Sequence, residues 1–65
     1  MIKVTRLNGV EYWLNPHLIE VIEKRPDTTI TLLSGKKIVV KESPEEIINK
    51  IIEYRRKLGI SAQEE

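Results

Sequence analysis

The sequence has no cysteine, a single histidine and three glycines among its 65 residues. The absence of cysteine excludes disulfides and thiolate metal sites. His17 has no partners at ligand spacing, which a zinc or catalytic site would need. Gly9, Gly35 and Gly59 are isolated from one another, so there is no glycine-rich loop to hold a phosphate. These absences argue against an enzyme, and we expect neither a cofactor nor a metal.

Long apolar segments and an excess of one charge are also missing. No stretch approaches the roughly 18–20 apolar residues that span a bilayer, and the first residues do not form a signal peptide. The chain has 11 basic and 10 acidic residues, giving a net charge of +1. A nucleic-acid-binding domain of this size is usually more basic. We therefore expect a cytoplasmic domain that does not insert into membranes.

The first 14 residues predict a β-hairpin. Asn8-Gly9 is typical of a two-residue type I′ turn, which requires positive φ at both central positions. Residues 2–7 and 10–14 flank it. In the second run, Val10, Tyr12 and Leu14 share one face of the expected strand.

Residues 15–24 allow two interpretations. Asn15-Pro16 ends the second strand, because proline lacks an amide donor and keeps the residue before it extended. The segment from Leu18 to Lys24 fits a short helix started by Asn15 and Pro16, or a strand with apolar residues on both faces. Its apolar run is short for a helix, which favours a strand.

Two further turns and a helix signal complete the pattern. Pro26-Asp27 and Ser34-Gly35 flank a β-branched run, so residues 18–41 predict a three-stranded meander. Ser43, Pro44 and Glu46 form a capping box with proline at the first helical position. The expected helix covers residues 44–58, with Gly59 ending it and residues 61–65 forming a frayed tail after a single domain of residues 1–60. Its apolar stripe consists of Ile47, Ile48, Ile51, Ile52, Tyr54 and Leu58.

About five short antiparallel strands and one amphipathic C-terminal helix predict an α+β, mainly β domain, built as a bent sheet or small open barrel. One helix covers only one face of a sheet. The apolar residues expected on the other face are Trp13, Leu18, Ile22 and Val39. We interpret them as an interface and expect a homo-oligomer. The alternative is that barrel curvature buries both apolar sets within one subunit.

Binding to RNA is a second functional hypothesis. Lys24-Arg25 and Lys36-Lys37 flank turns and could lie near one another, with Tyr12 or Trp13 stacking on bases. The lysines could equally keep strand edges from pairing with other chains. The near-neutral charge and the absence of phenylalanine favour this second explanation, so nucleic acid is not the expected partner.

Several short motifs, taken in order, resemble the FlbD/SwrD family of bacterial flagellar-operon proteins. The resemblance covers roughly residues 1–58. The motifs are Leu7-Asn8-Gly9, Leu14-Asn15-Pro16, Leu18-Ile19-Glu20, Pro26-Asp27-Thr28, Ile30-Thr31-Leu32, Ser34-Gly35-Lys36-Lys37 and Val40-Lys41-Glu42-Ser43.

The resemblance implies a non-enzymatic cytoplasmic protein that supports flagellar motility and swarming. It further implies an effect on motor power through the torque-generating stator units, which would be the partners. The family pattern supplies no catalytic residue. Lys24-Arg25 and the large Trp13 depart from the family pattern. Because they could alter the surface that binds a partner, the resemblance does not establish that this chain binds the same partner as other members. The positions that match it are turns and caps: Asn8, Gly9, Asn15, Pro16, Asp27, Gly35 and Ser43.

Overall fold

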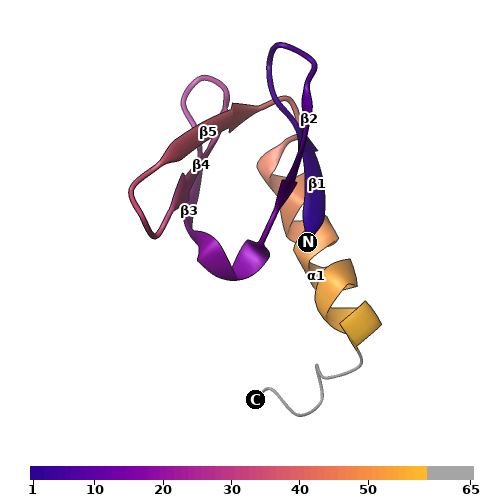
Figure 1. Ribbon diagram of the computed structural model, residues 1–65. Helices are drawn as coiled ribbons and strands as arrows, with labels where there is room; N and C mark the ends of the chain where they lie inside the picture. The colour runs from indigo at the N-terminus through magenta and orange to yellow at the C-terminus, as the bar shows by residue number, and fades with distance from the viewer. Residues whose placement is uncertain (59–65) are drawn as a thin grey trace.

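A computed structural model describes residues 1–58 of the chain. It confirms the predicted class, a mainly β protein of the α+β type with five short antiparallel strands and a C-terminal helix (Figure 1). The expected helix end at Gly59 and the tail at residues 61–65 lie outside the described residues. The elements are β1 (Ile2–Thr5), β2 (Glu11–Leu14), the 3-10 helix η1 (Pro16–Leu18), β3 (Ile19–Lys24), β4 (Thr28–Leu32), β5 (Lys37–Val40) and α1 (Pro44–Leu58).

The first hairpin pairs β1 with β2, but its turn is not the predicted type I′. Gly9 has a φ of +89°, whereas no residue other than glycine has positive φ within residues 1–58. The Gly9 amide donates to the Arg6 carbonyl, and the Arg6 amide donates to Val10. This is a three-residue loop with glycine in the left-handed position. The longer loop takes Val10 out of β2 and leaves it 55% exposed, so its predicted place on the strand face is wrong.

The second sheet is the expected meander, in the order β3-β4-β5. The strand favoured for residues 18–24 is confirmed from Ile19 to Lys24, whereas the helical alternative is wrong for this segment: the helical turn started by Asn15 and Pro16 is η1, which ends at Leu18. The Asn15 side chain starts η1 by accepting a bond from the His17 amide at 3.0 Å. A register shift leaves Glu20 unpaired between Ile19 and Val21. Such a bulge with a charged side chain disfavours pairing of another strand along β3.

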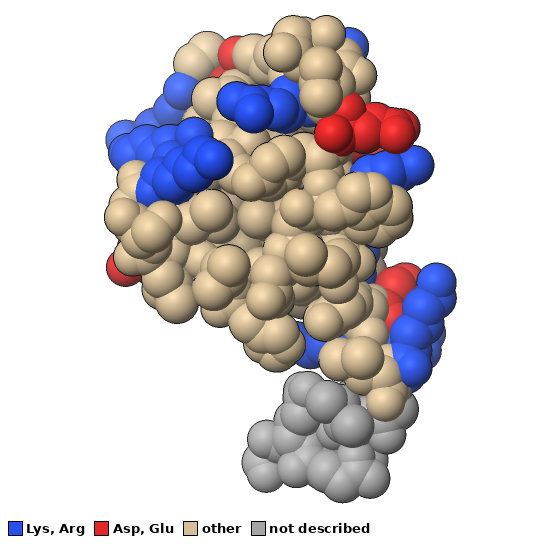
Figure 2. All heavy atoms as spheres, in the orientation of Figure 1, with Lys and Arg blue, Asp and Glu red and all other residues tan. Residues whose placement is uncertain are grey.

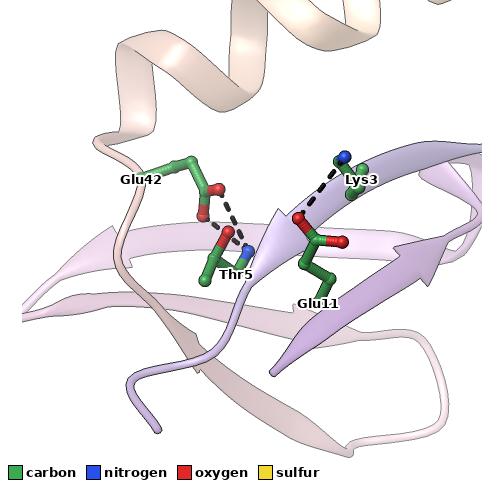
Figure 3. A network of polar contacts seen from close by, with 4 residues as sticks. All are labelled: Lys3, Thr5, Glu11 and Glu42. Atoms are coloured by element: carbon green, nitrogen blue, oxygen red, sulfur yellow. Dashed lines mark hydrogen bonds and ion pairs between the residues drawn. The ribbon is translucent and has the colours of Figure 1, made fainter. Parts of the chain in front are cut away.

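The two sheets meet where β1 ends beside β5. Arg6 forms an isolated bridge with Val40, and the Lys41 amide donates to the Thr5 carbonyl at 2.8 Å. The Thr5 amide points to Glu42, whose two carboxylate oxygens accept it at 2.9 and 3.0 Å (Figure 3). The Glu42 carboxylate therefore accepts the Thr5 amide as the carbonyl of a neighbouring strand would. This adds one hydrogen bond to the junction between β1 and β5.

The Glu42 carboxylate has a lowered pKa. Partial burial acts to raise the pKa, but hydrogen bonds from Thr5 and from the Glu42 backbone amide outweigh it, with help from the Lys50 ammonium. Hydrogen bonds donated to the charged form of an acid stabilise that form. Glu42 is thus held as the anion in the folded protein.

The helix α1 closes the core from the side of β1 and β3. Its start is fixed by a reciprocal capping box, in which the Glu46 amide donates to Ser43 Oγ at 3.1 Å and the Ser43 amide donates to Glu46 Oε1 at 2.9 Å. Ile47 is the one helix residue that is fully buried. The buried core consists of Ile2, Val4, Leu14, Ile30, Leu32, Ile38, Val40 and Ile47.

Candidate interaction surface

Trp13 is the largest exposed apolar side chain of the described residues, at 61% exposure. It lies on β2 opposite Lys3, on the face that points away from the core. Lys3 Nζ lies 5.9 Å from the centre of the Trp13 ring. It also lies 3.4 Å from a carboxylate oxygen of Glu11 (Figure 3). Lys3 also lines a groove of about 340 Å³ between β1 and α1. Trp13 is therefore an accessible aromatic side chain, and tryptophan is common at the energetic centres of interfaces.

The other predicted interface residues do not form one patch with Trp13. Ile22 and Val39 belong to the same sheet, but Ile22 lies in the inner row with Ile30, whereas Val39 lies opposite Thr29 in the outer row. Alternate residues of a strand point to opposite faces, so the two side chains diverge. Ile22 is half-buried against the core, and Val39 is 36% exposed.

Trp13 and Val39 are also separated along β1. Trp13 pairs with Lys3 near the start of this strand, whereas Val39 lines a cleft with Leu7, just beyond its end. Four residues of extended chain span about 13 Å. Leu18 is 47% exposed at the end of η1, and its carbonyl accepts the Leu33 amide at 2.8 Å. A partner that used all these side chains would have to contact more than one side of the domain.

One flank of α1 adds an exposed apolar area, which belongs to the apolar stripe predicted for the helix. Ile48 and Ile52 are 48% and 47% exposed, one helical turn apart, whereas Ile51 is partly buried against the core. The predicted stripe was too wide for a single helix face. At 100° per residue, Ile48 and Ile52 lie roughly 100–140° around the helix from Ile47. The width of the apolar stripe in the sequence could therefore have indicated that Ile48 and Ile52 remain exposed.

Basic side chains from both hairpins converge around Tyr12. Arg6 Cζ lies 5.9 Å from the centre of the Tyr12 ring, and Lys36 Nζ lies 5.8 Å from it. Next to them, a cleft of about 300 Å³ is lined by Arg6, Leu7, Asn8, Lys37 and Val39. On the face that Figure 2 draws, Lys and Arg side chains lie mostly in the upper part, with some acidic ones beside them, above a broad area of mainly uncharged residues. We call Arg6, Lys36 and Lys37 the basic cluster.

Lys24-Arg25 and Lys36-Lys37, which the RNA-binding hypothesis would bring together, lie apart. Lys24 pairs with Thr28 at one end of β4, and Lys37 pairs with Thr31 toward the other. Thr28 and Thr31 are three residues, or about 10 Å, apart along β4, so the two basic pairs are offset by the same distance. The pairs also belong to β3 and β5, which lie on opposite sides of β4. The partner of Lys36-Lys37 is instead Arg6, which the sequence places 30 positions away.

The turn and cap residues are engaged within the backbone. Asn8 Oδ1 accepts the Val10 amide at 2.9 Å, the Asp27 carbonyl accepts the Arg25 amide at 3.1 Å, and Gly35 has a φ of +93°. Pro16 is buried at the first position of η1.

Few described side chains are arranged for metal binding or acid–base chemistry. His17 is exposed and meets Tyr54 edge-on, with ring centres 6.2 Å apart. Within residues 1–58, no three of the histidine and acidic side chains converge as metal ligands. The helix α1 falls short of the length and apolarity that crossing a bilayer requires.

Comparison with known families identifies the group to which this fold belongs. The family model FlbD, described as flagellar and swarming motility proteins, matches residues 1–59. The chain belongs to the FlbD family. The match extends over both sheets and α1, so it confirms the resemblance found in the sequence motifs. No curated protein and no solved structure matches the chain. The family description associates the chain with flagella and swarming motility.

Proposed function

We propose that this FlbD-family chain is a non-enzymatic cytoplasmic accessory protein that supports flagellar motility and swarming. In this proposal it raises the power of the flagellar motor by binding other proteins, with the stator units as its targets. The observation that carries the proposal is the family match over residues 1–59. The exposure of Trp13, at 61%, supports a role in binding.

The direct test is deletion of the gene, with swarming rate and single-motor torque as the two measurements. The proposal expects slower swarming and lower torque, with unchanged numbers of flagella, and restoration of both by the intact gene. Normal swarming and normal torque in the deletion strain would contradict it. Lower swarming with normal torque would retain the motility role but exclude an effect on motor power.

Self-association is the second part of the proposal. Exposed apolar side chains in a chain of this size favour assembly, and we place Trp13 at the contact between copies. Trp13→Ala should change the free energy of unfolding by less than about 0.5 kcal/mol, because the side chain is mostly exposed. It should nevertheless lower the molar mass measured by light scattering. Leu33→Ala is the matched control, since Leu33 is equally exposed, at 62%, in a turn.

Two results would count against this part. A wild-type chain that stays monomeric at high concentration would exclude self-association. An assembly whose mass is the same in wild type and in Trp13→Ala would exclude Trp13 from the contact.

A further inference from the structure

The basic cluster is assembled by tertiary structure from two separate hairpins. Arg6 follows β1, whereas Lys36 and Lys37 follow the β4–β5 turn. Tyr12 lies between two of them, because its ring centre is 5.9 Å from Arg6 Cζ and 5.8 Å from Lys36 Nζ. Lys37 lines a cleft together with Arg6. A cation over an aromatic face is attracted by the ring quadrupole. Three positive charges therefore gather at one place on a chain whose net charge is only +1.

No described carboxylate neutralises this cluster. The ion pairs within residues 1–58 join Lys3 to Glu11 and Arg56 to Glu53, and neither includes a residue of the cluster. Two acidic residues lie near the end of β1: Glu11 pairs with Lys3, and Glu42 is directed to the Thr5 amide. Gathered cations without a carboxylate repel one another, and an incoming anion relieves that repulsion.

The cleft beside the cluster combines charge with apolar surface. Arg6 and Lys37 line it together with Leu7 and Val39, which are 49% and 36% exposed. Its volume of about 300 Å³ accommodates a few side chains rather than a folded domain. A matching ligand would present carboxylates to the cations and an apolar side chain to Leu7 and Val39.

We propose that the basic cluster and its cleft form the docking site for an acidic segment of a protein partner. Carboxylates of that segment would pair with Arg6, Lys36 and Lys37, while an apolar side chain would lie over Leu7 and Val39. This inference rests on the proposed function and specifies the chemistry of the partner. It also gives Val39 a role separate from that of Trp13.

Two observations favour a polypeptide over a nucleic acid. Tyr12 is half-buried, and two cations already lie over its ring, which leaves little aromatic face for a base to stack on. With a net charge of only +1, the chain also offers little of the general electrostatic attraction to phosphates on which nucleic-acid binding depends. An acidic peptide can place its few charges on the cluster alone.

The test is an NMR titration of the isotope-labelled chain with two probes. One probe is a short peptide of glutamate and leucine, and the other is an oligouridine of equal charge. The peptide should shift the amide signals of Arg6, Lys36 and Lys37. The double variant Lys36→Glu/Lys37→Glu should weaken peptide binding by roughly tenfold or more, because it places like charges against the peptide.

The matched control is Lys24→Glu/Arg25→Glu, which makes the same change of charge at the other end of β4. Both its side chains are exposed, and it should alter peptide affinity by less than about twofold, since distant surface charges are screened. Amide spectra of the free variants establish that each is folded. Equal weakening by the two double variants, shifts located elsewhere, or tighter binding of oligouridine would overturn the proposal.

A motility assay separates failure of this inference from failure of the proposed function. If the deletion strain swarms poorly and the Lys36→Glu/Lys37→Glu gene does not restore it, whereas Lys24→Glu/Arg25→Glu does, the docking site is supported. If both variant genes restore swarming fully, the motility role stands and the docking site is wrong. Normal swarming of the deletion strain removes the proposed function itself.

Discussion

Replacing Glu42 by alanine should destabilise the fold by separating the two sheets at their junction. The change leaves the Thr5 amide without its acceptor, next to the bond from Lys41 to Thr5 that remains. An unmade hydrogen bond at a partly buried amide costs about 1–2 kcal/mol. In a domain of this size, that loss lowers the melting temperature by roughly 7–15 °C. Glu42→Gln should lose about half as much, because its amide oxygen still accepts the bond without a charge.

The difference between wild type and Glu42→Gln should depend on pH with a definite sign. The pKa of Glu42 in the folded protein lies below its ordinary value of 4.5. The stability that the charged Glu42 carboxylate contributes to the fold is therefore fully present above pH 4.5. It is lost as the pH falls through the lower pKa that Glu42 has in the folded protein. At pH 7 the wild type should be more stable than Glu42→Gln, and in acid the two curves should converge.

The assay is urea denaturation followed by circular dichroism at several pH values. Glu23→Gln is the matched control, since the Glu23 side chain is exposed on β3 and makes no hydrogen bond or ion pair with the described residues. Its effect should stay within about 0.5 kcal/mol. Equal stability of wild type and Glu42→Ala at pH 7, or a Glu42→Gln difference that grows in acid, would refute the reasoning.

Three further changes test the capping box, the core and a turn. Ser43→Ala removes the acceptor of the Glu46 amide and should cost about 1 kcal/mol in thermal melts. Ile47→Ala should cost about 2–5 kcal/mol in urea denaturation, because Ile47 is fully buried, whereas the same change at exposed Ile52 should have a small effect. Gly35→Ala should cost about 1 kcal/mol through backbone strain alone, since φ is +93° and the new Cβ would meet no atom within 4 Å. A loss several times larger at Gly35 would show that the turn does more than reverse the chain.

Local patterns accounted for the fold class because its elements are specified by nearby residues. Alternating side chains define the strands, and Ser43 with Glu46 marks the start of α1 within four positions. The hairpin at Asn8-Gly9 was predicted with the wrong turn. The dipeptide fits both a two-residue and a three-residue loop, and the pairing of Arg6 with Val10 decides between them.

The surface was less predictable, because its features depend on residues far apart in the chain. Glu42 and Thr5 are 37 positions apart, and no local signal indicates that a side chain continues the strand ladder. The convergence of Arg6 and Lys36 on Tyr12 likewise requires the two hairpins to be placed first. The interface residues Trp13, Leu18, Ile22 and Val39 stay predictions, now with Ile22 and Val39 on opposite faces of one sheet.

The contact between β1 and α1 has a consequence for synthesis on the ribosome. The first strand leaves the ribosome first, yet Ile2 and Val4 share their core with Ile47, which is made more than 40 positions later. Closing so long a loop is slow compared with forming a local turn. The nascent hairpin must therefore remain soluble with its apolar side uncovered. Truncated translation products that end before Pro44 should consequently be captured by chaperones.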